Sequence, residues 1–170
     1  LETGYSGLDR VFNVSRKEIE KKLKENIPNK LLLVAEAFRK KINIKRIHNL
    51  SKIDPWFLEQ IKEIVDNENE IKNKGLPRNF NEFNKIKSIG FSDKKLSELS
   101  NLSEDVIRRK RSAMKVMPVY KKVDTCAAEF KSFTPYMYST YQRSFSINSQ
   151  CEAEPSNKKK IIILGGGPNR

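Results

Sequence analysis

The stretch from Asp54 to Gly75 constrains the fold most, because it carries the signals of one long helix from its first residue to its last. Asp54 is a favoured N-cap residue, and Pro55 stands at the first helical position, where a missing N–H costs nothing. Gly75 can adopt the left-handed backbone that ends a helix. The apolar residues between these ends recur at helical spacing. They predict a buried face made of Phe57, Ile61, Ile64, Val65 and Ile71.

Shorter helices are predicted on both sides of this long one. Ser15 and Glu18 form a capping box, which starts a helix over about 16–26. Asn29 is expected to cap a helix over about 30–40, whose shared face holds Leu31, Val34, Ala35 and Phe38. "RNFNEFNKIKSIG" (78–90) repeats the pattern with Phe80, Phe83 and Ile86, and two short helices follow that are capped by Ser92 and Ser103. The chain is therefore predicted to be mainly α-helical.

The character of the sequence changes at Pro118. "VMPVYKKVDTCAAEF" (116–130) and "TPYMYSTY" (134–141) are rich in β-branched and aromatic residues, so extended, partly buried segments are expected. The polar stretch 142–160 is typical of a linker. "KIIILGGGPNR" (160–170) has a short apolar run stopped by glycines, which is typical of a parallel strand that feeds a phosphate-facing turn. The predicted fold is a helical bundle-like domain, then extended segments and one orphan β-strand of a following α/β domain.

The charge of the chain raises the question of a polyanionic partner. Its 34 Lys and Arg residues against 21 Asp and Glu give a net charge of +13, which attracts nucleic acid. The alternative is a solvated surface in a composition rich in Lys, Asn and Ile, with acids interleaved among the bases. We favour the second interpretation. No apolar run reaches the roughly 18 residues of a membrane span and no signal peptide opens the chain, so we expect no membrane contact and a cytoplasmic location.

The strongest nucleic-acid pattern is "SDKKLSELSNLSEDVIRRKR" (92–111), two short helices that resemble a helix-turn-helix. Arg108, Arg109, Lys110 and Arg111 are the residues that would meet DNA. They stand at the C-terminal end of the second helix, however, whereas recognition helices read bases from their N-terminal residues. Glu104 and Asp105 occupy that N-terminal turn and would repel phosphate. We keep a free-standing basic DNA-binding module as the alternative function, and expect no specific nucleic-acid binding.

Residues of catalytic or metal-binding type form no recognisable arrangement. Cys126, Cys151 and His48 lack the spacing of a metal site, so we expect free thiols, a buried Cys126, and a packing or surface role for His48. The acids of the long helix are expected to form a solvated face: Glu59, Glu63, Asp66, Glu68 and Glu70. Trp56, beside Phe57, is expected to anchor core or partner contacts. We predict no catalytic residue and no metal ligand.

The segments "VYKKVDTCAAEF" (119–130), "TPYMYSTY" (134–141), "CEAEPSNKKK" (151–160) and "IIILGGGPNR" (161–170) resemble, in order and spacing, the middle of the carbamoyl-phosphate synthase large subunit. "NLSKIDPWFLEQIKEIV" (49–65) and "IKSIGFSDKKLSEL" (86–99) are similar to the helical stretch that precedes it. The resemblance covers nearly the whole chain. It implies three parts: residues 1–9 end the first half, residues 10–150 form the helical oligomerisation domain with an extended interdomain segment, and residues 151–170 open the second half.

The resemblance also implies a function. In that family two ATP-grasp halves make carbamoyl phosphate, for arginine and pyrimidine biosynthesis, from bicarbonate, two molecules of ATP and ammonia that a glutaminase small subunit supplies from glutamine. The ATP and its Mg²⁺ or Mn²⁺ would bind in the ATP-grasp halves, so we expect no cofactor and no activity in this segment alone. Gly165, Gly166 and Gly167 are the candidates for a phosphate-facing loop. Trp56 and Phe57 are the candidates for contact with other large subunits.

Overall fold

The computed structural model describes residue 5 and residues 7–127, 129–131, 133–141 and 151–161. These residues form helices joined to one small antiparallel sheet, which confirms the mainly α-helical prediction. In chain order the elements are α1 (Arg16–Lys22), α2 (Lys30–Arg39), α3 (Ile44–Ser51), α4 (Pro55–Lys74), α5 (Phe80–Ser88), α6 (Asp93–Ser100), α7 (Glu104–Ala113), β1 (Val119–Lys122) and β2 (Met137–Thr140). Gly165–Gly167 and the predicted orphan strand lie outside the described residues.

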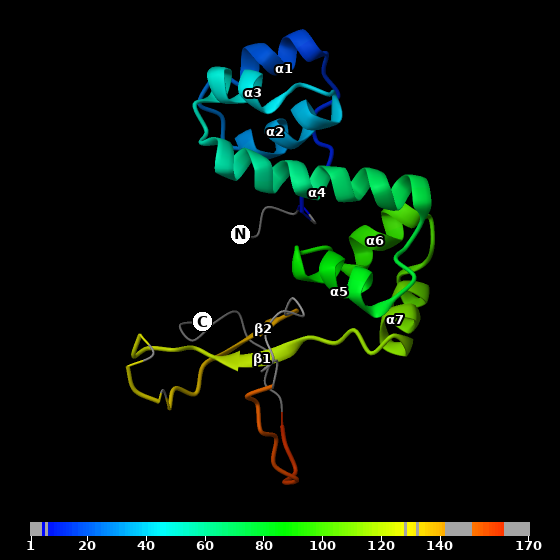
Figure 1. The fold of residues 1–170 in the computed structure, drawn as a ribbon, viewed down its shortest axis with the longest axis vertical. Helices are drawn as coiled ribbons and strands as arrows, with labels where there is room; N and C mark the ends of the chain where they lie inside the picture. The colour runs from blue at the N-terminus through cyan, green and yellow to red at the C-terminus, as the bar shows by residue number, and fades with distance from the viewer. Residues whose placement is uncertain (1–4, 6, 128, 132, 142–150, 162–170) are drawn as a thin grey trace.

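The long helix α4 is the axis of the domain. Helices α1, α2 and α3 gather on one side of it, and α5, α6 and α7 lie on the other (Figure 1). Each group has its own hydrophobic cluster: Leu58, Ile61 and Val65 of α4 belong to the first, and Ile71 of α4 belongs to the second. The large, fully buried side chains include Leu33 and Ile47 in the first cluster and Phe83 and Leu96 in the second.

The predicted helix starts are confirmed at most caps. The Ser15 side chain accepts from the Glu18 N–H at 3.3 Å, and Asp54 Oδ1 accepts from the Trp56 N–H at 2.8 Å. Ser92 and Ser103 cap α6 and α7 in the same way. Asn29 holds the N-cap position of α2, but its side chain makes no cap hydrogen bond. Gly75 ends α4 with the positive φ expected of it, +82°, but its ψ of −168° is extended and not that of a left-handed helix.

Helix α3 was not predicted from the sequence, although its local signals are present. The side chain of Asn43 accepts from the Arg46 N–H at 2.8 Å, which starts the helix. Lys52 ends it in the left-handed conformation at φ +60°. His48 lies on this helix, and its Nδ1 is 2.8 Å from the carbonyl oxygen of Ile53. This hydrogen bond, in a half-buried position, agrees with a packing role for the histidine.

The predicted buried face of α4 is confirmed at Ile61, Val65 and Ile71. Leu58 is fully buried, whereas Phe57 keeps 56% of its surface exposed, so its predicted place in the buried face is wrong. On a 3.6-residue helix Phe57 lies about 40° from Ile61, within the arc of the buried residues, so helical spacing alone does not account for its exposure in the first turn. Two other residues assigned to shared faces are also exposed: Leu31 at 57% and Phe80 at 44%.

The prediction of a solvated Glu68 is wrong as well. Its carboxylate is buried and accepts from Arg39 of α2, with Oε2 2.8 Å from Nη2 and 3.0 Å from Nε. The Arg39 guanidinium also pairs with Glu36 at 3.4 Å and donates to the backbone carbonyl of Leu8. Lys95 of α6 pairs with the adjacent Asp9 at 2.9 Å. The N-terminal segment is thus bound to α2 and α6 beside the middle of α4.

A second cluster of ion pairs joins α5, α6 and α7. Asp93, at the start of α6, lies 2.7 Å from Lys87 Nζ of α5 and 3.1 Å from Arg111 Nε of α7. Burial alone would raise the pKa of Asp93, but the hydrogen bond and charge of Lys87, with those of Arg111, hold that pKa below its ordinary value. The three helices therefore share one carboxylate.

The extended segments form a hairpin that lies beyond α5–α7 (Figure 1). Strands β1 and β2 pair antiparallel, with Val119 opposite Thr140. Glu152 returns to β1, where its carboxylate accepts from the Lys122 N–H at 2.8 Å and pairs with Lys121 at 2.9 Å. Extended structure was predicted correctly here. Burial was overestimated, because β2 is exposed along most of its length and Cys126 is only half-buried.

We predict that Glu68→Ala lowers the free energy of unfolding by about 3–5 kcal/mol, because it leaves the buried Arg39 guanidinium without its main partner. Glu59→Ala, on the exposed face of the same helix, is the control and should change stability by less than about 0.5 kcal/mol. Urea unfolding of both variants measures the difference. A double variant, Arg39→Met with Glu68→Met, should recover part of the loss. Equal costs for Glu68→Ala and Glu59→Ala would contradict the prediction.

We predict a pH-dependent loss of stability through Asp93. Because the folded-state pKa is lowered, the contribution of this carboxylate is complete above its unfolded value of about 3.9 and is lost as pH falls through the folded pKa. Asp93→Asn should cost about 3 kcal/mol at neutral pH, and this deficit should shrink below about pH 4. Urea unfolding across pH tests it, with the exposed Asp105→Asn as control. A deficit that does not change with pH would contradict the assignment.

Candidate functional site

Two exposed aromatic rings stand at the N-terminal end of α4. Trp56 and Phe57 keep 59% and 56% of their surfaces exposed, and their ring centroids lie 5.0 Å apart in an edge-to-face arrangement at 86°. The structure thus brings together both residues predicted to contact a partner. Neither ring is needed to fill the first hydrophobic cluster, whose α4 members begin with Leu58.

The local sequence explains why these rings are held in place. The Asp54 cap fixes the first turn of α4 through the Trp56 N–H, and Pro55 restricts the backbone between them. Buried Leu58 attaches the same turn to the core. Aromatic side chains on a rigid turn lose little conformational entropy when a partner covers them, and Trp is prominent among residues that dominate interface energies. The pair is therefore chemically suited to protein contact.

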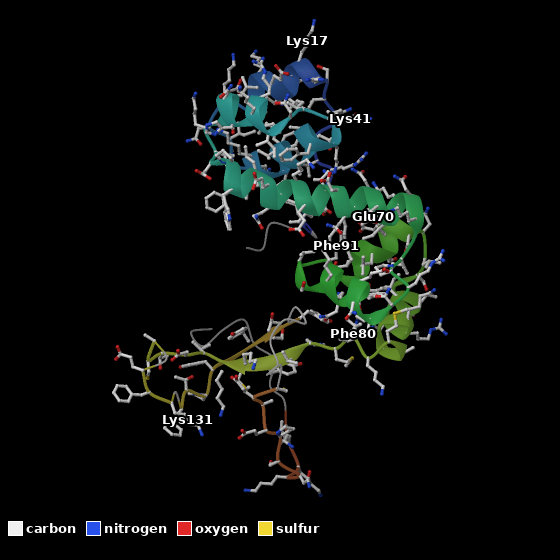
Figure 2. The ribbon with its side chains drawn as sticks, viewed as in Figure 1. Lys17, Lys41, Glu70, Phe80, Phe91 and Lys131 are labelled. Carbon is white, nitrogen blue, oxygen red and sulfur yellow. The ribbon has the colours of Figure 1, made fainter. Side chains whose placement is uncertain are left out.

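A second exposed apolar surface lies on the hairpin and its connecting loop. Phe130 and Phe133 are exposed at 75% and 83%, and Tyr136 and Tyr138 at 65% and 52%. Sequence reasoning missed this surface, because the richness in aromatic residues was taken to indicate burial. Lys131, labelled in Figure 2, extends from the same loop, with Nζ 5.8 Å from the ring centroid of Phe133. The loop therefore exposes aromatic rings and a positive charge side by side.

The basic residues of α7 are largely engaged within the protein. Arg108 pairs with Glu104 at 3.3 Å and with Asp105 at 3.4 Å. Arg109 Nε donates to the carbonyl of Asp105 at 3.4 Å, and Arg111 turns inward to Asp93 and to the carbonyl of Val116. Three of the four residues that would meet DNA thus already have partners: carboxylates for Arg108 and Arg111, and a backbone carbonyl for Arg109. Helices α6 and α7 follow each other across a short turn, as predicted, but Arg108 and Arg111 pair with carboxylates of these same two helices.

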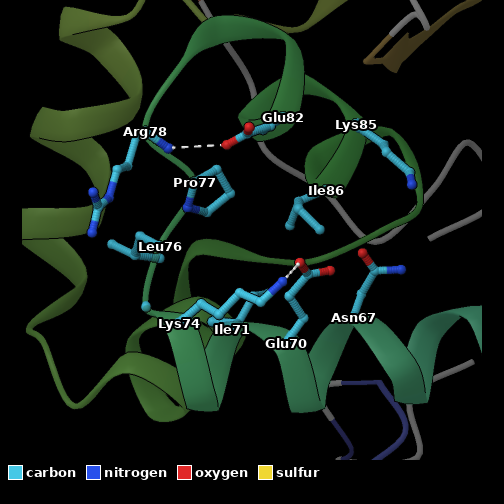
Figure 3. Close-up of a pocket in the computed structure, with 11 residues that line it drawn as sticks. Asn67, Glu70, Ile71, Lys74, Leu76, Pro77, Arg78, Glu82, Lys85 and Ile86 are labelled. Carbon is cyan, nitrogen blue, oxygen red and sulfur yellow. Dashed lines mark hydrogen bonds and ion pairs between the residues drawn. The ribbon is translucent and has the colours of Figure 1, made fainter.

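An open cavity lies between the C-terminal half of α4 and α5 (Figure 3). Its volume is about 690 Å³, and apolar Ile71, Leu76 and Ile86 line it together with charged side chains. Lys74 Nζ is 2.8 Å from Glu70 Oε1, and Glu82 accepts from the backbone N–H of Arg78 at 3.4 Å. The hydrogen bond and charge of Lys74 lower the pKa of Glu70. The residues that line this cavity include no nucleophile beside a general base.

The described part of the chain contains both cysteines. Cys126 and Cys151 are free thiols there, as predicted. The described residues contain no group of three or more His, Cys, Asp or Glu side chains placed to hold a metal ion. Among the same residues, no helix combines the length and the apolar composition that crossing a bilayer requires. The two exposed apolar surfaces are therefore the main candidates for function.

Comparison with known proteins identifies the family of this chain. Residues 1–115 match the family described as carbamoyl-phosphate synthetase large chain, oligomerisation domain. The whole chain aligns with the carbamoyl phosphate synthase large chain of Brucella melitensis at 43% identity, of Neisseria meningitidis at 44% and of Vibrio cholerae at 46%. The chain spans about 15–16% of the length of these relatives. This chain belongs to the carbamoyl-phosphate synthase large chain family, within the region that contains its oligomerisation domain.

Proposed function

We propose that this chain is the oligomerisation and interdomain segment of a carbamoyl-phosphate synthase large chain. The match of residues 1–115 to the oligomerisation domain supports self-association as its task. The exposed Trp56 and Phe57 supply the contact with a second large chain, because burying two adjacent rings removes a large apolar area from water. The observation that carries the proposal is this rigid, exposed pair on a domain of that family.

The interdomain role rests on the hairpin. Residues 1–9 end the first ATP-grasp half, residues 10–150 hold the helical domain and the extended segment, and residues 151–170 begin the second half. The exposed rings of Phe130, Phe133 and Tyr136 lie after residue 115, beyond the part that matches the oligomerisation domain. They pack against the neighbouring halves of the same large chain. The segment thereby keeps the two halves in a fixed relation.

The reaction belongs to the full enzyme. Its ATP-grasp halves make carbamoyl phosphate in the cytoplasm from bicarbonate, two molecules of ATP and ammonia, which a glutaminase small subunit releases from glutamine. Nucleotide and Mg²⁺ or Mn²⁺ bind in those halves. This segment contributes assembly rather than chemistry, and it catalyses no reaction alone. The pairing of charges described above for the segment favours this assignment over the alternative of a DNA-binding module, because Arg108 and Arg111 are already neutralised by carboxylates.

We predict that the double variant Trp56→Ser, Phe57→Ser weakens self-association at least about 30-fold, since each interface hot spot contributes about 2 kcal/mol or more. Sedimentation velocity over a concentration series measures the dissociation constant. Phe80→Ser is the matched control, because Phe80 is also an exposed aromatic residue but lies on α5. Circular dichroism should show unchanged helix content in all three proteins. Unchanged association of the double variant would overturn the assigned interface.

We predict that DNA binding by this chain is weak and not sequence-selective. A net charge of +13 attracts any duplex at low salt, and such binding falls steeply as salt rises. A filter-binding titration with several duplexes at rising potassium chloride measures the salt dependence. Arg108→Gln should have no larger effect than Lys17→Gln, which lies on α1 far from the helix-turn-helix (Figure 2). Selective binding at physiological salt would favour the DNA-binding alternative.

A further inference from the structure

A basic cavity lies where the N-terminal segment meets α2, α4 and α6, and self-association does not account for it. Its volume is about 310 Å³, near the lower end of the range of about 300–1,000 Å³ typical of small-molecule pockets. Four cationic side chains and three carboxylates line it together with Leu99: Arg10, Arg39, Lys72, Lys95, Asp9, Glu68 and Glu98. The walls thus come from four separate parts of the chain.

Two of the four cations are neutralised by the carboxylates. Arg39 is buried against Glu68, with Nη2 3.0 Å from Oε1 and 2.8 Å from Oε2. Lys95 Nζ lies 2.9 Å from Asp9 and 3.6 Å from Glu98. These pairs account for all three carboxylates of the lining. Two of these pairs, Arg39 with Glu68 and Lys95 with Asp9, join elements that are distant in sequence and so hold the walls of the cavity together. The pair of Lys95 with Glu98 lies within α6.

The other two cations, Arg10 and Lys72, have no such partner. Within the described ranges neither side chain forms an ion pair or a hydrogen bond. Burial lowers the pKa of Lys72, and the charge of Arg10 lowers it further, as do Arg39 and Lys95, while Glu68 opposes the change. Both Arg10 and Lys72 are exposed, so a ligand from solution can reach them. An anion between Arg10 and Lys72 would remove this repulsion.

We propose that this cavity binds a single phosphate group, with Arg10 and Lys72 as its direct ligands. A guanidinium donates two parallel hydrogen bonds to phosphate oxygens, and an ammonium adds a compact point charge. The three carboxylates limit the net charge of the lining to +1, since four cations oppose three anions. The site therefore suits one phosphate, free or as a small monoester, rather than a polyanion such as DNA.

The position of the site gives phosphate binding a structural consequence. Arg10 belongs to the N-terminal segment, and Lys72 to the part of α4 that enters the second hydrophobic cluster. A ligand held by both would connect the segment to α4 next to the Arg39–Glu68 pair. Phosphate should therefore stabilise the junction between the two clusters as well as neutralise two charges.

Calorimetric titration of the chain with inorganic phosphate, against potassium chloride at equal ionic strength, tests the proposal. Arg10→Gln with Lys72→Gln should weaken binding at least tenfold, because both direct ligands are lost. Lys17→Gln removes an exposed lysine of α1 and should leave the dissociation constant unchanged. Glycerol 2-phosphate forms the second arm: binding equal to that of phosphate indicates a monoester site, and weaker binding indicates a site for the free ion.

A spectroscopic measurement separates this site from general attraction to a basic protein. Phosphate should raise the pKa of Lys72, followed by NMR of its side chain, towards the ordinary lysine value. The titration of Lys17 should not move. The proposal is overturned if phosphate up to about 10 mM gives neither binding heat nor a shift at Lys72. It is equally overturned if Lys17→Gln and the double variant weaken binding by the same factor.

Discussion

The buried ion pair between Arg39 and Glu68 is the contact on which the arrangement of this domain depends. It stands on α4 between Val65, the last buried residue of that helix in the first hydrophobic cluster, and Ile71, its buried residue in the second. Hydrophobic packing is tolerant of small displacements, but a desolvated ion pair is stable only in a narrow geometry. The pair therefore fixes the register of α2 against α4. Its net contribution to stability is small, but removing one partner is costly because the other charge is left buried and unpaired.

The same guanidinium extends this constraint to the N-terminal segment. Arg39 donates to the carbonyl of Leu8, and the adjacent Asp9 pairs with Lys95 of α6. The segment thus touches an element of each hydrophobic cluster, and its position places Arg10 beside Lys72. Both side chains line one cavity, and the charge of Arg10 lowers the pKa of Lys72. The basic cavity is in this sense a product of the contacts that build the domain.

Local signals in the sequence predicted the ends of the helices, whereas long-range contacts decided which faces are buried. Asp54, Ser92 and Ser103 act within three residues of themselves, so their roles can be predicted from spacing. Glu68 looked like its solvated neighbours because its partner, Arg39, lies 29 residues away. Trp56 and Phe57 were identified as interface candidates, but only the packed structure shows that Leu58 takes the buried position beside them. The basic cavity had no signal in the sequence, because its lining converges from four elements.

The long helix also determines how the two proposed sites relate. Trp56 and Lys72 are separated by about 24 Å along α4, given a rise of 1.5 Å per residue over their sequence separation. The helix between them is held by Leu58, Ile61 and Val65 and then by the pair of Glu68 with Arg39. Phosphate could affect self-association only by shifting α4 along its axis or rotating it, and either movement would break that buried pair. Because breaking it costs several kcal/mol, the two sites should act independently unless Arg39 first finds another anionic partner.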